Sequence, residues 1–225
     1  MEIIPGIHRI DGVRGANAYL VIGQDEMLVI DTGLPGNAKR IAAYVKGLRK
    51  NVSDIKFIIL THADIDHIGS AAELKRMTGA KLAIHADDAA ILRGKQSFKA
   101  MRGPLGFIFK QAMRLMRYHP VEPDIILGAD SEIEGFKIIH VPGHTNGSIC
   151  VYKPGKVIFA GDALRSDSSG NPKPIFWISS LDRTKARASL RAIATLDFDT
   201  LLAGHGAPVV GSASQKVKDM VARQR

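Results

Sequence analysis

The most informative segment of the sequence is Phe57-Ile58-Ile59-Leu60-Thr61-His62-Ala63-Asp64-Ile65-Asp66-His67. Its first four residues are apolar and predict a short strand that is covered on both faces. Four potential metal ligands follow within six residues: His62, Asp64, Asp66 and His67. A loop after a strand end lets such closely spaced side chains converge on one point, which a helix of this length does not allow. Their imidazole nitrogens and carboxylate oxygens suit zinc, iron or manganese.

Three further ligand candidates lie later in the chain, each after a strand-like run and beside a glycine. They are His144 after Lys137–Val141, Asp162 after Val157–Ala160, and His205 after Thr200–Ala203. Glycine lets the backbone turn sharply and come close to an ion. Ligands presented from several strand ends of one sheet are expected to form a site at its edge.

Strand-like and helical segments alternate along the rest of the chain. Further strands are expected at Ile3–Ile10, Ala18–Ile22, Met27–Ile30, Lys81–Ile84, Glu132–Glu134 and Ile149–Tyr152, and a loop at Ser166–Pro174. Helices are expected at Asn37–Leu48, Ile68–Met77, Thr184–Leu196 (with Asp182 as N-cap) and Ser214–Arg225. This order predicts a layered α/β sandwich in one domain, residues 1–225.

Residues 89–121 form a basic insertion in this pattern, with seven Lys or Arg and no acid. Its apolar residues predict one helical stripe: Leu105, Ile108, Phe109, Ala112, Leu115 and Met116. Three interpretations stay open: a helical lid, a dimer contact, or a helix that binds a membrane surface. Candidate walls of a substrate pocket are Phe107, Met113, Met116, Tyr118, Phe176 and Trp177.

Composition excludes several classes of protein. The 225 residues include one cysteine, Cys150, which rules out an intramolecular disulfide scaffold. A membrane-spanning helix needs about 20 apolar residues in a row, and the apolar runs here are far shorter. No secretory signal is visible at the start, so a cytoplasmic location is expected. The net charge of +9 permits nucleic acid, anionic membranes or acidic substrates as partners without selecting among them.

Five motifs in order resemble the metallo-β-lactamase superfamily, in its branch of lactonases and hydroxyacylglutathione-hydrolase-like enzymes. The motifs are Asp-Thr-Gly at Asp31–Gly33, the His-rich loop at His62–His67, Pro-Gly-His-Thr at Pro142–Thr145, Gly-Asp at Gly161–Asp162, and Gly-His-Gly at Gly204–Gly206. The resemblance implies an αββα four-layer sandwich with a dinuclear metal centre on its rim. The two divalent ions are expected to be zinc, with iron and manganese as alternatives.

The resemblance also assigns the ligands. It implies that His62 and His144 bind the first metal, that Asp66, His67 and His205 bind the second, and that Asp162 bridges both. Asp31 is implied as a structural residue near the site. One position departs from the family's His-x-His-x-Asp-His loop, because Asp64 stands where the second His is expected. Either Asp64 binds the first metal through oxygen, or the first site is weak and only the second fills.

The implied activity is hydrolysis of a lactone, ester or thioester of a small molecule by a metal-bound hydroxide. Asp66 is the expected catalytic residue, orienting the hydroxide and passing its proton to the leaving group. No serine or cysteine nucleophile is required, because the metal-bound hydroxide is the nucleophile. The chain also lacks Gly-x-Ser-x-Gly, and Cys150 lies in a strand-like run.

Two other functions stay open. The charge and the basic insertion favour a phosphodiesterase or nuclease, although nucleic acid is not the expected partner. A single iron would instead serve oxygen-dependent sulfur chemistry. A small-molecule substrate is expected, with a homodimer through the insertion as an option and a membrane surface not favoured. Structural roles are expected for His8, His85, His119 and His140, and cap or turn roles for Asp54, Asp87, Asp88 and Asp130.

Overall fold

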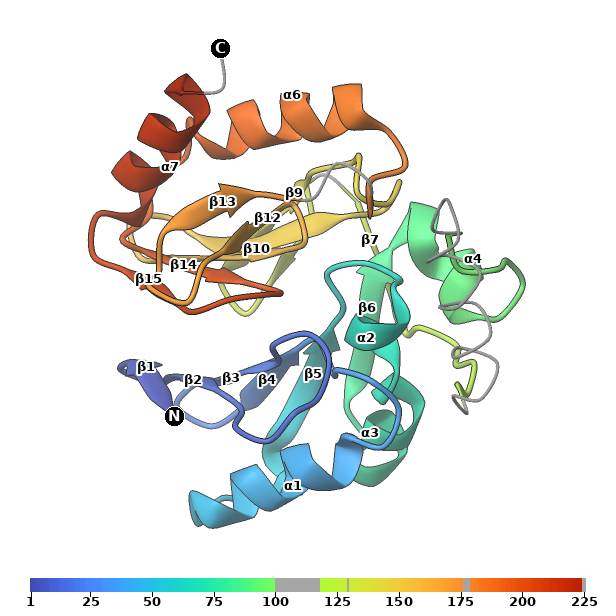
Figure 1. Ribbon diagram of the computed structural model, residues 1–225. Coiled ribbons are helices and arrows are strands. Elements are labelled where there is room, and N and C mark those ends of the chain that lie inside the picture. Colours follow the sequence, from blue (N-terminus) through green and yellow to red (C-terminus); the bar gives the residue numbers. More distant parts are fainter. Residues whose placement is uncertain (100–117, 129, 176–178, 224–225) are drawn as a thin grey trace. The chain divides into compact units, whose positions relative to one another are not determined.

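The computed structural model describes residues 1–99, 118–128, 130–175 and 179–223, which fall into two compact units. The first unit holds Met1–Ile84 and Ala89–Ile126, and the second holds His85–Asp88 and the chain from Leu127 onward. Each unit contains a mixed β-sheet with flanking helices, in agreement with the predicted α/β class (Figure 1). The expectation of a single domain stays a prediction.

The sheet of the first unit has seven strands in sequence order among the described residues. Neighbours are antiparallel from the first strand to the fourth, and the fourth, fifth and sixth are parallel. The strands are β1 (Glu2–Ile4), β2 (Ile7–Arg9), β3 (Tyr19–Ile22), β4 (Met27–Ile30), β5 (Ile55–Ile59), β6 (Lys81–His85) and β7 (Ile125–Leu127). The strand predicted at Phe57–Leu60 corresponds to β5, which begins two residues earlier and ends at Ile59. Its side chains Ile58 and Ile59 are fully buried.

Helices α1 (Ala38–Gly47) and α3 (Ala71–Thr78) pack against each other along one face of this sheet (Figure 1). The helix predicted at Ile68–Met77 is confirmed as α3 over residues 71–77, but its start is wrong, because Ile68 ends the separate short helix α2 (Ile65–Ile68). Gly69 brings the backbone against Pro35, where a Cβ would lie 2.4 Å from the proline ring. The next residue, Ser70, donates its hydroxyl to the Leu34 carbonyl (2.7 Å). These contacts tie the break to a neighbouring loop.

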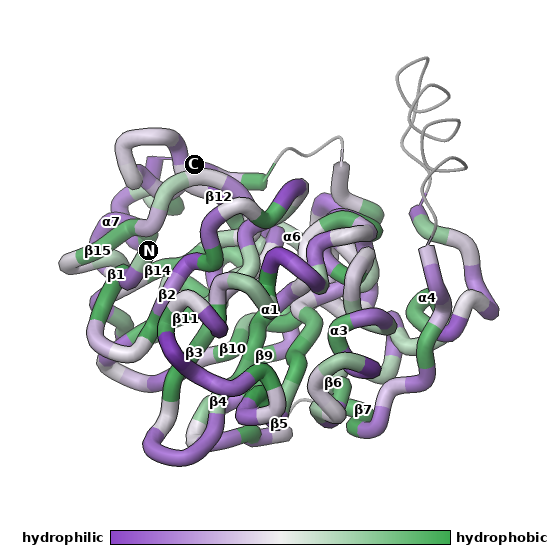
Figure 2. Tube along the Cα trace, turned by 90° about the horizontal axis from the view of Figure 1, so that it is seen from below, coloured by the Kyte–Doolittle hydropathy of each residue, from purple (hydrophilic) through white to green (hydrophobic). Residues whose placement is uncertain are grey.

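The second unit has a six-stranded sheet among its described residues, in the order β15-β14-β11-β10-β9-β8. Only the β11–β14 pair is parallel among its registered pairs. The strands are β8 (Glu132–Ile133), β9 (Phe136–His140), β10 (Ile149–Lys153), β11 (Val157–Gly161), β14 (Thr200–Ala203) and β15 (Val209–Val210). Phe159 and Cys150 are fully buried in it. In Figure 2 much of the strand path is coloured as hydrophobic, as burial requires.

Helices α6 (Arg183–Ile193) and α7 (Ala213–Ala222) lie over this second sheet (Figure 1). Asp182 is the N-cap of α6, as predicted. Its side chain accepts hydrogen bonds from the backbone N–H groups of Thr184 and Lys185, both at 2.9 Å. These bonds satisfy two of the four N–H groups that lack a partner at the start of a helix.

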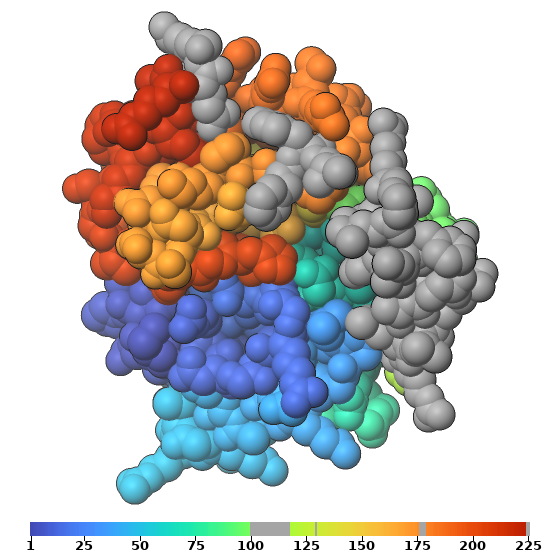
Figure 3. Space-filling view, in the orientation of Figure 1, coloured from blue at the N-terminus to red at the C-terminus, as the bar shows by residue number. Residues whose placement is uncertain are grey.

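The loop expected at Ser166–Pro174 is instead a hairpin of β12 (Leu164–Ser166) and β13 (Pro172–Pro174). Asp167 closes its turn by accepting the backbone N–H groups of Ser169 (3.0 Å) and Asn171 (2.9 Å). The hairpin lies at the surface of its unit (Figure 3). Two prolines argue against a strand here, but β13 tolerates them because, among the described residues, β12 is its one strand partner and β13 is therefore an edge strand.

The basic insertion is described only at its two ends. It opens with the short helix α4 (Ala89–Leu92), and Tyr118 near its other end donates its hydroxyl to the Leu92 carbonyl (2.7 Å). Tyr118 also meets Phe98 edge to face, with ring centroids 5.1 Å apart. The predicted helical stripe and the pocket walls at Phe107, Met113, Met116, Phe176 and Trp177 lie outside the described residues.

Across the described ranges, the helices are all too short or too polar to cross a membrane.

We expect Asp182→Ala to lower the free energy of unfolding by about 1 kcal/mol, the usual effect of losing an N-cap. Urea titration followed by circular dichroism measures this change. Asp197→Ala, at an exposed aspartate just after α6, is the matched control and leaves the midpoint nearly unchanged. Equal effects of the two substitutions would contradict a cap role for Asp182.

Candidate metal centre

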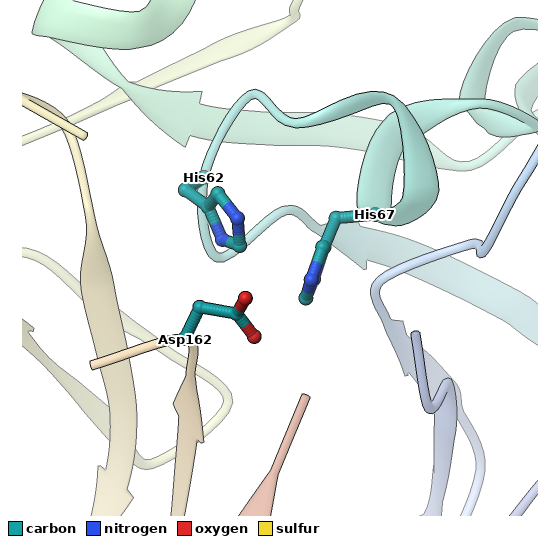
Figure 4. A group of neighbouring side chains, drawn as sticks. All are labelled: His62, His67 and Asp162. Carbon is teal, nitrogen blue, oxygen red and sulfur yellow. The ribbon is translucent and has the colours of Figure 1, made fainter. Parts of the chain in front are cut away.

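Two histidines of the first unit meet just beyond the end of β5. His62 lies in the loop after β5 and His67 lies in α2. Both side chains are fully buried, and their ring centroids are 4.0 Å apart at an interplanar angle of 50°. Figure 4 shows the His62 ring on this loop and the His67 ring on α2, and it also draws Asp162, which follows β11. The two histidine side chains therefore lie close together, as the pattern of a strand followed by a loop predicts.

A buried carboxylate, Asp31, orients His67. Asp31 Oδ2 accepts the Nδ1–H of His67 at 2.8 Å. Asp31 also accepts the backbone N–H of Thr61 (2.8 Å, to Oδ1) and the Thr61 hydroxyl (2.7 Å, to Oδ2). A carboxylate on Nδ1 fixes the histidine tautomer and leaves Nε2 as the donor atom for a metal. Carboxylates are commonly found in this position behind metal-binding histidines.

The backbone around Asp31 is held as firmly as its side chain. Asp31 has a φ of +59°, which a non-glycine residue adopts rarely and at a cost. Its N–H donates to the Ile59 carbonyl (3.0 Å), so it bridges the ends of β4 and β5. The next residue, Thr32, donates both its N–H (2.7 Å) and its hydroxyl (2.9 Å) to the His67 carbonyl. Asp31 and Thr32 thus hold both the ring and the backbone of His67.

Asp64 and Asp66 lie between His62 and His67 in the sequence, and both are half-buried. The Asp64 carbonyl accepts the N–H groups of His67 (2.9 Å) and Ile68 (3.0 Å) and so opens α2. The Asp64 carboxylate is close to two groups, because its Oδ2 lies 3.5 Å from His62 Nε2 and 2.6 Å from Lys99 Nζ. Sequence reasoning missed Lys99, which lies 35 positions away among seven similar basic residues.

The second unit carries the other three candidates. His144 Nε2 lies 3.6 Å from Asp162 Oδ2, and His205 Nε2 lies 3.5 Å from the same oxygen. His144 and Asp162 are buried, whereas the His205 side chain is 40% exposed. One carboxylate oxygen between two imidazole nitrogens is a suitable donor set for a divalent metal.

Two of the glycines beside these ligands are required by close packing. Gly143 has a φ of +136°, and a Cβ there would lie 2.2 Å from the backbone nitrogen of Ala186. Gly206 has a φ of +102°, and its Cβ would lie 2.0 Å from the Ser166 carbonyl. The backbone next to His144 therefore rests on α6, and the backbone next to His205 rests on β12.

Asp88, predicted to serve as a cap or turn residue, is a buried anchor of the His144 loop. Its carboxylate accepts the Thr145 hydroxyl (2.7 Å) and the N–H of Gly147 (2.9 Å). Thr145 is itself held by Ser148, whose Oγ accepts its backbone N–H (3.0 Å). No motif marks Asp88 in the sequence, because its partners lie almost 60 residues away.

The second unit also contains another group of potential metal ligands, His85, Asp87 and His140. Their ligand atoms lie within 4.8 Å of one another. The two imidazoles stack at 4.1 Å with a 12° interplanar angle. His85 Nδ1 accepts the Asp87 N–H (3.3 Å), and His140 Nε2 donates to the Asn146 carbonyl (2.8 Å). Both nitrogens that face Asp87 thus have protein partners, which favours the structural role expected for these histidines.

Each unit therefore gathers imidazoles and carboxylates of the kind that zinc, iron and manganese accept. The individual ligand roles stay predictions. The one cysteine does not compete as a nucleophile, because Cys150 is fully buried and burial raises the pKa of its thiol far above neutrality.

A family model described as the metallo-β-lactamase superfamily matches residues 11–205. Among curated proteins, a protein named probable metallo-hydrolase YflN of Bacillus subtilis is 27% identical over 93% of this chain and 87% of its own length. Hydroxyacylglutathione hydrolase GloC of Haemophilus influenzae is 28% identical over 79% of each chain. Human acyl-coenzyme A thioesterase MBLAC2 is 29% identical over 68% of this chain and 60% of its own.

Solved structures share the fold. A metallo-β-lactamase family protein of Thermus thermophilus aligns with a TM-score of 0.73 at 22% identity. The alignment covers 98% of this chain and 80% of that protein. The protein TTHA1623, solved in a di-iron-bound form, aligns with a TM-score of 0.69 at 24% identity. The alignment covers 90% of this chain and 93% of that protein. The predicted metallo-β-lactamase fold, with two mixed sheets and flanking helices, is confirmed.

We expect Asp31→Asn to lower the affinity for Zn²⁺ by about 10- to 100-fold, as loss of a carboxylate behind a ligating histidine does. The amide fills the same space but no longer fixes His67 by a charged hydrogen bond. Isothermal titration calorimetry on metal-free protein measures the affinity. Asp25→Asn, at an exposed turn residue, is the control, and equal affinities for both variants would contradict the orienting role of Asp31.

The pH dependence of stability tests the His85 environment. Burial, and next the neighbouring His140, lower the pKa of His85 below its ordinary value of 6.5. The unfolded chain then binds more protons than the folded one, so this histidine destabilises the fold as the pH falls below about 6.5. We expect His85→Gln to lose less unfolding free energy than the wild type between about pH 7 and pH 5. Urea titrations at each pH measure this, and the exposed His119→Gln is the control; equal pH slopes for the wild type and His85→Gln would contradict the assignment.

Proposed function

Because this chain belongs to the metallo-β-lactamase superfamily, we propose that it hydrolyses a lactone, ester or thioester of a small molecule. The family match and the His and Asp side chains suited to metal binding identify the chain as a metal-dependent hydrolase. The observation that carries the proposal is the Asp31–His67 hydrogen bond, since it prepares an imidazole for a metal.

Thioesters are the first substrates to test. Two of the relatives carry names that refer to thioester hydrolysis, the acyl-coenzyme A thioesterase and the hydroxyacylglutathione hydrolase. Both are less than 30% identical to this chain, so they support the class of bond and not the acyl or thiol group. Lactones and oxygen esters stay in the proposal because the same attack on a carbonyl cleaves them.

The proposed roles follow the resemblance. His62 and His144 would hold the first metal, Asp66, His67 and His205 the second, and Asp162 both. Bound divalent metals supply a nucleophile from water at neutral pH and polarise the substrate carbonyl. Asp31 keeps the His67 ring in its tautomer, and Thr32 keeps its backbone in place. Asp66 would take a proton from water and give it to the leaving group.

Zinc is the proposed metal, and iron and manganese are tested beside it. The donor set of imidazoles and carboxylates accepts all three, and one protein of the same fold is described as di-iron-bound. Two ions are proposed for the full site. We further propose a small-molecule substrate, and a homodimer through residues 89–121, which the molar mass from light scattering will test.

A substrate panel after metal loading tests the proposal. We expect activity on acyl thioesters, lactones or esters, and little on β-lactams. Selective cleavage of a phosphodiester, with affinity that falls steeply between about 50 and 200 mM salt, would point instead to a nuclease. One bound iron and oxygen uptake with a thiol would point to sulfur chemistry.

The second test uses the proposed ligands. His67→Ala is expected to remove one metal and abolish hydrolysis. Asp66→Asn is expected to lower kcat by about 10²- to 10⁴-fold, the usual contribution of a proton-transferring group. His119→Ala, an exposed histidine of the insertion, is the control and keeps both metal content and kcat. Full activity of His67→Ala with unchanged metal content would overturn the assignment.

A further inference from the structure

The Asp64 carboxylate, the departure from the family motif, already has a cationic neighbour in the protein. Lys99 Nζ lies 2.6 Å from Asp64 Oδ2, and the Lys99 side chain is only 10% exposed. The same oxygen lies 3.5 Å from His62 Nε2. Lys99, Asp64 and His62 all belong to the first unit. A lysine of the basic insertion is thus placed beside the first metal position that the resemblance assigns to His62.

This ion pair is less screened by water and salt than an ion pair at the surface. The Asp64 side chain is 17% exposed, so both charged groups are largely removed from water and from screening by salt. A lysine ammonium has three donors and no acceptor, so it binds the carboxylate but cannot itself bind a metal. Its positive charge also opposes a second cation close by.

We propose that Lys99 weakens the first metal position by holding the Asp64 carboxylate, so that the chain binds one divalent ion tightly and a second only weakly. The inference rests on the proposed function and chooses between the two open interpretations of Asp64. Asp66 and His67 would serve the tight ion, because Asp31 prepares His67 independently of Lys99. Lys99 is a positioning residue, since it acts through Asp64.

The test is the number and affinity of bound metal ions, which needs no substrate. Metal-free wild type and variants are titrated with Zn²⁺ and then Mn²⁺ by calorimetry, and metal content after dialysis is measured by mass spectrometry. We expect one tight equivalent in the wild type and a second at least 100-fold weaker. Lys99→Met, which keeps the length of the side chain without its charge, is expected to tighten the second equivalent at least tenfold.

Three matched variants separate charge from structure. Lys99→Arg keeps a cation beside Asp64 and is expected to behave as the wild type. Lys95→Met removes an exposed lysine of the same segment and is expected to change nothing. The double variant Lys99→Met with Asp64→Asn is expected to lose the gain, because the freed carboxylate is then absent. Circular dichroism and thermal unfolding of the metal-free proteins check that each variant folds.

The outcomes distinguish this inference from the proposed function. Two tight equivalents in the wild type, or no gain in folded Lys99→Met, would overturn the inference alone. A gain that persists in the double variant would also overturn it, since Asp64 would not then be the group that Lys99 restrains. Failure of every folded variant to bind any metal would contradict the proposed function as well.

Discussion

The carboxylate of Asp31 accepts three hydrogen bonds at once, from the backbone and hydroxyl of Thr61 and from the ring of His67. Those bonds join the end of β4, the loop after β5, and α2. The rare backbone conformation of Asp31 is maintained because its N–H also pairs with β5. The position of the His67 ring depends on this buried carboxylate. Removing it would leave the histidine free to rotate or to change tautomer.

Much of this arrangement could be predicted from the sequence, because it depends on local patterns. A short apolar run followed by polar side chains marked β5 and the His62–His67 loop, and Asp182 before a periodic segment marked the start of α6. Glycines beside His144 and His205 marked positions where the backbone passes close to other segments. The order of the motifs indicated the family, and a family model that matches residues 11–205 confirms it.

The remainder depends on contacts between residues that are far apart in the sequence, which local patterns do not encode. Asp88 and Thr145 meet across 57 positions, and neither has a spacing that suggests the other. Lys99 is one of seven similar basic residues in its segment, and only the folded chain selects it as the partner of Asp64. The hairpin β12–β13 was missed because its prolines are unfavourable in a central strand but acceptable in an edge strand such as β13.

The burial of Cys150 has a consequence for experiments on this chain. Since it is the only thiol in the sequence and is fully enclosed within the second sheet, a maleimide or disulfide reagent reaches it only when that sheet opens. Its labelling rate, followed by mass spectrometry, therefore reports local opening of the second unit without any engineered probe. The same enclosure protects the protein from oxidation of its sulfhydryl while it stays folded.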